Sequence, residues 1–255
     1  MNIFLIVAIL GFVGAFIAGM AGIGGAIIMI PLLYFVPPLL GVEQLSMQTI
    51  AAITIVQVCV ATGSAVLVHK SNNFVNSQLV IWMGTSIIIG SLIGGFGSKY
   101  VPEEFLSIIF ATLALIASVM MFIPKKNTSE SEELIFNKPL AAASAGIVGA
   151  LAGLVGAGGA FMLVPIMLYI LRIPLRITVG SSLGIVFFSA ASGFIGKVLS
   201  GQMIWSLALA ITLGAFPGAR LGGKLSKFIP EKTLKIILAV LICGSAIKMW
   251  VDILF

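Results

Sequence analysis

Long apolar stretches, separated by short polar breaks, make up most of this chain. Charged residues are absent before Glu43, and each later uncharged run is long enough for the roughly 20 apolar residues that cross a bilayer. These runs cover residues 44–68, 71–98, 105–124, 139–171, 177–196 and 198–219. The pattern predicts eight hydrophobic segments, over about 3–40, 46–68, 79–98, 104–123, 139–171, 175–197, 203–223 and 232–254. It is typical of an all-α polytopic membrane protein.

Two of these segments are too long for one ordinary crossing. At 1.5 Å per residue, a helix over 3–40 would measure about 57 Å and one over 139–171 about 50 Å, whereas the hydrocarbon core is about 30 Å thick. Each contains four glycines near its middle, in AGMAGIGGA (18–26) and AGLVGAGGA (152–160). Adjacent glycines are poor helix formers. We therefore predict that both segments break there into two shorter helices.

Close packing is the alternative explanation for glycine in a membrane helix, because a missing side chain lets two helices approach. We expect that role for two pairs of glycines spaced by four residues, Gly90 with Gly94 and Gly218 with Gly222. The clusters differ from these pairs because each coincides with an over-long segment. Breakage is the preferred interpretation for the clusters, and packing stays open.

The order of motifs repeats along the chain. After the glycine clusters, SMQTIAAITIV (46–56) weakly matches RITVGSSLGIV (176–186), and GGFGSKYVPEEFLSIIFATL (94–113) matches GGKLSKFIPEKTLKIILAVL (222–241). The matches occur in the same order, which predicts a tandem duplication of about 125 residues. We expect a first transmembrane repeat over 1–123, a polar connecting loop over 124–138 and a second transmembrane repeat over 139–255.

The basic residues indicate how the broken segments cross. If each broken segment crosses only once, the two sides of the membrane carry nearly equal numbers of Lys and Arg. If each returns to its starting side, one side carries only Lys99 and Lys197, and the other carries Lys70, Lys125, Lys126, Lys138, Arg172, Arg176, Lys224, Lys227 and Lys232. The positive-inside rule favours the second pattern. It predicts halves inverted relative to each other, eight to ten helices, and both termini outside.

Composition agrees with a membrane protein and excludes other classes. Hydrophobic residues make up 60% of the chain and charged residues 9%, against about a quarter charged in soluble domains. The formal net charge of +6 lies in the breaks between segments, which favours a lipid bilayer over nucleic acid as the partner. Cys59 and Cys243 lie in apolar segments and the only histidine, His69, at a segment end. We therefore expect no metal, cofactor or catalytic cluster, and hence no enzyme.

The predicted breaks are the best candidates for a binding site. Backbone groups freed inside lipid must face protein, water or a ligand. The half-helices beginning near Ala26 and Ala160 would direct their positive N-terminal dipoles there. In an inverted repeat the two breaks approach near the midplane, as at the sites of secondary transporters, and two N-termini facing one cavity favour an anion. We expect the substrate to contact Gly22, Gly24, Gly25, Gly156, Gly158 and Gly159.

Polar residues on the following segments extend this candidate site. They are Gln48, Thr49, Gln57, Ser181 and Ser182. Amides are costly in lipid, so Gln57 should face the protein interior. Arg220 also belongs to the candidate site, because a guanidinium binds oxyanions through paired donors; the alternative is that it extends to the membrane surface beside Lys224. No acidic residue lies deep in a segment, so the sequence shows no carboxylate relay for protons.

The duplicated motifs AGMAGIGGAIIMIP (18–31) and AGLVGAGGAFMLVP (152–165), followed by VGSSLGIV (179–186), resemble those of the sulfite exporter TauE/SafE family of permeases. The resemblance covers essentially the whole chain. It implies a transporter in the bacterial cytoplasmic membrane that moves small sulfur-containing anions such as sulfite, sulfoacetate or related sulfonates, often outward. One departure is that Ser181-Ser182-Leu183 has only Ala51-Ala52-Ile53 as its counterpart, so the two halves need not contact the substrate equally.

These features favour a secondary transporter of a small anion that works by alternating access, and the resemblance implies that the anion contains sulfur and is exported. A passive anion or small-solute channel is the alternative, because channels also tolerate broken helices that line water. A membrane-embedded enzyme would need a buried nucleophile, base or metal cluster, and a purely structural scaffold would leave the matched breaks unexplained. Assembly into a homo-oligomer and the identity of a coupling ion stay open.

Overall fold

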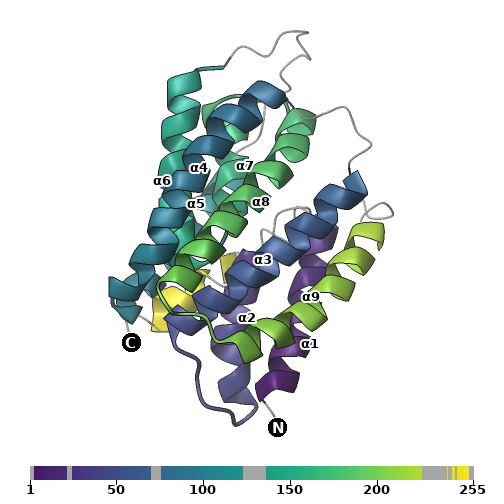
Figure 1. Ribbon diagram of the computed structural model, residues 1–255, viewed down its shortest axis with the longest axis vertical. Helices are drawn as coiled ribbons and strands as arrows, with labels where there is room; N and C mark the ends of the chain where they lie inside the picture. The colour runs from purple at the N-terminus through teal and green to yellow at the C-terminus, as the bar shows by residue number, and fades with distance from the viewer. Residues whose placement is uncertain are drawn as a thin grey trace.

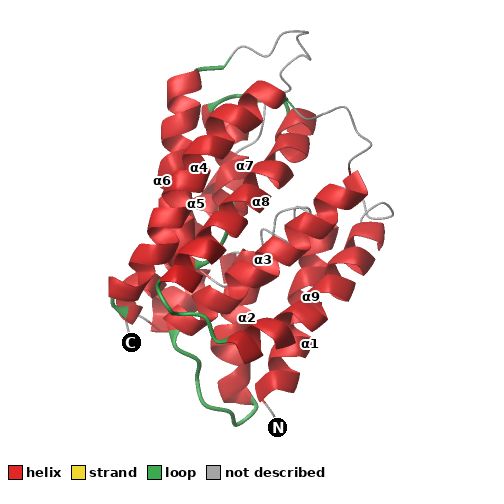
Figure 2. Cartoon of the chain, viewed as in Figure 1, coloured by secondary structure: helices red, strands yellow, loops and turns green. Residues whose placement is uncertain are grey.

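The computed structural model describes residues 3–21, 25–69, 76–122, 136–225, 240, 243–244 and 246–252. Helices dominate this described part, which contains no strand (Figure 2). In chain order they are α1 (Ile3–Ala21), α2 (Ala26–Leu39), α3 (Met47–His69), α4 (Ser77–Gly97), the 3-10 turn η1 (Ser98–Tyr100), α5 (Glu103–Phe122), α6 (Lys138–Val155), α7 (Ala160–Pro165), the π-helical turn η2 (Ile166–Ile170), α8 (Leu175–Leu199) and α9 (Trp205–Leu225). Six of them, α1, α3, α4, α5, α6 and α8, are long and apolar enough to cross a membrane. The predicted all-α polytopic membrane fold is confirmed.

Two pairs of helices from distant parts of the chain pack side by side, α1 with α9 and α4 with α6 (Figure 1). Both contacts depend on glycine. A Cβ at Gly90 or Gly94 would overlap the backbone of α6, and a Cβ at Gly218 or Gly222 would overlap the backbone of α1. The packing role predicted for these four glycines is confirmed.

The first glycine of each cluster belongs to the same two interfaces. Gly19 faces the backbone of Ala219, and Gly153 faces the backbone of Ser91. Both glycines lie inside helices, α1 and α6. Close packing therefore accounts for the start of each cluster, whereas the later glycines have a different role.

The first interruption lies between α1, which extends to Ala21, and α2, which begins at Ala26. Gly25 directly precedes α2 with a φ of 72°, in the left-handed region that L side chains rarely adopt. Gly22 and Gly24, both predicted to contact substrate, lie outside the described residues.

The second interruption is described in full. α6 ends at Val155 and α7 begins at Ala160. Between them Gly156, Gly158 and Gly159 have φ angles of 76°, 64° and 79°. Only glycine adopts such angles without strain, so the residues that predict the break also produce it. α7 continues directly into η2, which gives an apolar half-helix over 160–170.

Helices α3 and α8, which are counterparts in the predicted repeat, pack against each other in opposite directions. Gly63 of α3 faces the ring of Phe187 on α8, while Ile55, earlier on α3, faces Gly193, later on α8. An inverted repeat requires this antiparallel relation between counterparts. The repeat boundaries, the inversion and the outside position of both termini remain our proposal.

We expect Gly94→Ala to destabilise the protein, because the added methyl group would push α4 and α6 apart. Overpacking of this kind costs about 1–3 kcal/mol. Gly97→Ala is the matched control, because it ends the same helix and nothing lies within 4 Å of the position of its Cβ. Thermal unfolding of the purified proteins in detergent measures the difference. Equal midpoints for the two variants would contradict close packing at this interface.

A second pair of variants separates backbone strain from contact at the break. Gly156 and Gly41 have φ angles of 76° and 73°, but only a methyl group at Gly156 would overlap a neighbour, the backbone of Ala51 on α3. Gly41→Ala should cost about 1–2 kcal/mol from strain alone, and Gly156→Ala should cost clearly more. The same unfolding measurement tests both variants. An equal loss of stability in the two would mean that α3 does not contact the break closely at Gly156.

Candidate functional site

Helix α3 lies against both interruptions. A Cβ at Gly25 would lie 3.2 Å from Nε2 of Gln57, and a Cβ at Gly158 would lie 2.7 Å from Cγ1 of Val58. Gln57 and Val58 are consecutive on α3, so the two breaks meet this helix within one turn of each other. The structure therefore brings Gly25, Gly158 and Gln57 of the predicted site together.

Gln57 is the polar group at this meeting point. Its side chain is 0% exposed, and neither its amide nitrogen nor its amide oxygen has a hydrogen-bond partner in the described part of the protein. Thr54, one turn earlier on the same face of α3, is also fully buried with an unpartnered hydroxyl. Burying such groups without partners is unfavourable by about 1–3 kcal/mol each. An unpaired amide beside a helix break is therefore a strong candidate for ligand binding.

The two half-helices add backbone donors on either side of α3. In α2 the helical hydrogen bonds start with Ile28 N to Gly25 O at 3.2 Å, and in α7 with Met162 N to Gly159 O at 3.2 Å. The amides before these bonds belong to helix N-termini, which carry partial positive charge. Within the described residues, His, Cys, Asp and Glu do not gather in groups of three that could hold a metal ion. Backbone and amide donors are thus the available chemistry.

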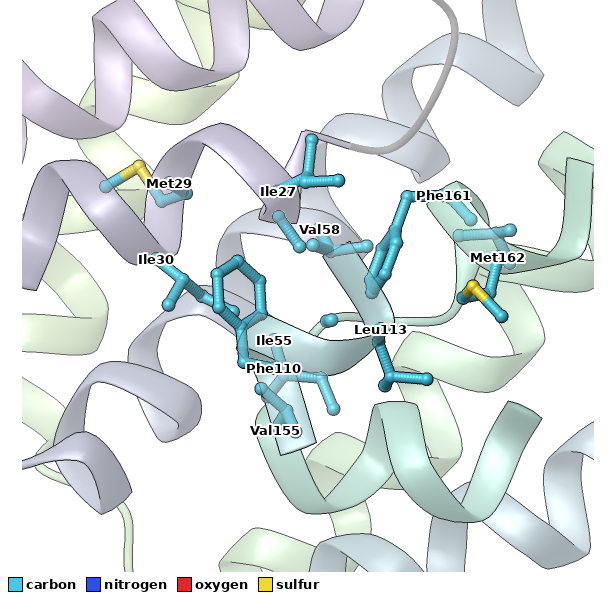
Figure 3. Packing of buried hydrophobic residues seen from close by; sticks show 14 of the residues in the cluster. Ile27, Met29, Ile30, Ile55, Val58, Phe110, Leu113, Val155, Phe161 and Met162 are labelled. Carbon is cyan, nitrogen blue, oxygen red and sulfur yellow. The ribbon is translucent and has the colours of Figure 1, made fainter. Parts of the chain in front are cut away.

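Apolar side chains fill the region around the half-helices. Figure 3 shows Ile27 of α2, Val58 of α3 and Phe161 of α7 gathered with Phe110 of α5, all of them buried. The rings of Phe110 and Phe161 meet edge to face, with centroids 6.3 Å apart. This apolar cluster lies beside the half-helices that the sequence predicts to line the site.

The other neutral candidates have partners elsewhere. Gln48 donates from Nε2 to the carbonyl of Val101 at 3.4 Å, and the hydroxyl of Thr49 accepts from Ser46 Oγ at 2.9 Å. These bonds place both residues at the start of α3, more than two turns before Gln57. Ser181 accepts a bond from the backbone N–H that precedes α4, and Ser182 is buried beside it on α8. The structure does not bring these four residues to the unpaired amide.

Arg220 lies apart from the breaks. It is exposed on α9, with its guanidinium carbon 4.1 Å from the ring centroid of Phe216. Arginine side chains commonly stack on aromatic rings in this way at protein surfaces. The position fits the alternative that Arg220 extends toward the membrane surface.

The distribution of basic residues predicts Lys197 among the charges of a loop, and this prediction is wrong. The residue lies in the last turn of α8, and its side chain is 0% exposed. A signal was present in the sequence, because this single lysine separates the uncharged runs 177–196 and 198–219. A charge with long apolar neighbours on both sides is a candidate for the membrane interior.

Comparison with known proteins places the chain among membrane transporters. It is 26% identical to the probable membrane transporter protein YunE of Bacillus subtilis (strain 168), over 94% of each chain. It is 28% identical to a probable membrane transporter protein of Haemophilus influenzae, over 96% of this chain and 97% of the relative. No solved structure matches the chain. A family model described as sulfite exporter TauE/SafE matches residues 7–249, and the protein therefore belongs to the sulfite exporter TauE/SafE family.

Proposed function

We propose that this protein is a secondary transporter that exports small sulfur-containing anions, such as sulfite or sulfonates, across the bacterial cytoplasmic membrane. The observation that carries the proposal is the unpaired, fully buried amide of Gln57 beside the break at Gly25. The family description names sulfite export, and the relatives are named as membrane transporters. Transport of an anion through the breaks is the function that joins these facts.

The donors at the breaks favour an anion over a cation. Helix N-termini attract negative charge, and glycine lets a ligand approach the backbone closely. Gln57 adds an N–H₂ group that can donate two hydrogen bonds. Its counterpart in the predicted repeat is Phe187, which carries no donor. We therefore propose that the polar side-chain contact at the breaks comes from the first half.

Buried apolar side chains beside the breaks favour alternating access over a permanently open, water-lined channel. In this proposal the half-helices move relative to α3 and α5 to let an anion pass. The short half-helices are the natural moving parts, since α2 and the 160–170 half-helix are both too short for an ordinary crossing. A passive channel gated by a hydrophobic constriction is the second candidate, because such constrictions exclude water when closed.

Reconstituted protein separates the transporter from the channel. We expect uptake of radiolabelled sulfite into proteoliposomes to saturate with concentration and to be competed by unlabelled sulfite and sulfoacetate. A carrier saturates because each cycle moves a bound substrate. Protein-free liposomes are the control. Anion currents that increase linearly with voltage and do not saturate would instead support a channel.

Gln57→Leu should change stability and transport in opposite directions. Removing an unpaired buried amide relieves its desolvation, so the unfolding midpoint should stay the same or rise. Loss of a hydrogen bond to a charged substrate should lower sulfite uptake about tenfold or more. Thr62→Val is the control, because Thr62 is buried on the same helix but already donates to the carbonyl of Val58 at 2.7 Å. If Gln57→Leu took up sulfite at the wild-type rate, Gln57 would not be part of the substrate site.

A further inference from the structure

Lys197 places an amine in the protein interior. It lies in the span Gly180–Leu199, its side chain is fully buried, and its hydrogen-bond partners belong to η1 and α6. Its ammonium group donates to the hydroxyl of Ser98 at 2.8 Å and to the carbonyl of Leu154 at 3.4 Å. Neither partner is charged, and within the described residues no carboxylate pairs with it.

A protonated Lys197 would therefore lack a counter-ion among the described residues. An ammonium group has three N–H donors, and the structure engages two of them, one at the long distance of 3.4 Å. Isolated buried charges are strongly unfavourable, and they persist where they pair with another charge or serve a ligand. In membrane segments such residues mark ion or substrate paths.

The groups that face the Lys197 amine are acceptors, the hydroxyl oxygen of Ser98 and the carbonyl of Leu154, and the hydroxyl of Ser98 in turn donates to Gln202. Gln202 donates from its amide nitrogen to the carbonyl of Gly95 at 3.2 Å and to the hydroxyl of Ser200, and its amide oxygen lies 3.0 Å from the hydroxyl of Ser98. The amide hydrogens of Gln202 and the hydroxyl hydrogens of Ser98 and Ser200 all have acceptors here, so an oxyanion beside the amine would be met only if the two hydroxyl groups turned away from these acceptors.

The Lys197 cluster, consisting of Lys197, Ser98, Ser200 and Gln202, lies close to a membrane surface. Gln202 is half-buried, the adjacent Gly201 is exposed, and Lys99, next to Ser98, is exposed as well. The loop over 200–204 therefore separates the cluster from the surface. A second positive charge at Lys99 would attract anions to this entrance.

The cluster also contacts the second break. Leu154 is two residues before Gly156, in the last turn of α6, so the Lys197 ammonium group binds a carbonyl at the end of the interrupted helix. Displacement of the 160–170 half-helix would change the hydrogen bond between Lys197 Nζ and this carbonyl. Lys197 thus lies between the 200–204 loop at the surface and the end of α6 at the second break.

We propose that the Lys197 cluster is a second anion subsite of the transporter, in which the ammonium group of Lys197 balances the charge of the substrate between the second break and the membrane surface. The proposal rests on the proposed function and extends it from neutral donors to a full positive charge. The competing explanation is that Lys197 only caps the carbonyl end of α6, where cations are favourable.

Titration calorimetry on the purified protein separates the two explanations. Sulfite, thiosulfate and sulfoacetate are the probes, with chloride at equal ionic strength in the reference cell. Lys197→Met should weaken binding about tenfold or more, since it removes an ionic hydrogen bond, whereas Lys197→Arg should stay within a few-fold of wild type. Lys224→Met, at an exposed lysine in the last turn of α9, is the control for surface charge and should change binding little.

Wild-type affinity in Lys197→Met, with a lowered unfolding midpoint, would mean that Lys197 is only a cap and would overturn the subsite. Failure of the wild-type protein to bind any of the three anions would overturn the proposed function itself. If Lys197→Met does not fold, crystals of the wild-type protein soaked in selenite answer the same question. We expect anomalous density within hydrogen-bonding distance of Lys197 Nζ, and selenium sites found only elsewhere would contradict the subsite.

Discussion

Backbone N–H and C=O groups have no water to bind inside a bilayer, so every interruption of a membrane helix must be compensated by protein or ligand. This protein has such an interruption at Gly156–Gly159 and a second before α2, where Gly25 has a positive φ. Both lie against α3, at Val58 and at Gln57. The contacts of α3 with both breaks are part of the compensation that this constraint requires.

The remaining helices hold the broken ones in place. α1 packs on α9 and α6 packs on α4 through glycines that bring backbones together, so the long arm of each broken segment is fixed to a helix from the other half of the chain. The shorter arms, α2 and α7 with η2, are apolar and bury their side chains against α3 and α5 (Figure 3). The long arms are fixed, whereas the short arms are held only by apolar packing. This arrangement would allow the short arms to move during transport.

Much of this arrangement could be predicted from the sequence. Apolar runs fixed the membrane class, glycine pairs predicted the close contacts, and the cluster at 156–159 predicted a break that the structure has. Side-chain positions could not be predicted in the same way, because they depend on which helix faces which. Gln48 and Ser181 bond to distant backbone groups, Arg220 stacks at the surface, and Lys197 is buried, although spacing along the chain treats them alike.

The account requires that the two breaks line the path of the substrate, and cysteine accessibility tests this most directly. In a background with Cys59 and Cys243 replaced by serine, single cysteines at Ala26 and Ala160 would be exposed to a membrane-impermeant thiol reagent from each side of proteoliposomes. We expect each cysteine to react from one side at a time, with the reactive side changing when a sulfite gradient is imposed. If neither cysteine reacts from either side while sulfite is being transported, the path lies elsewhere and the account is wrong.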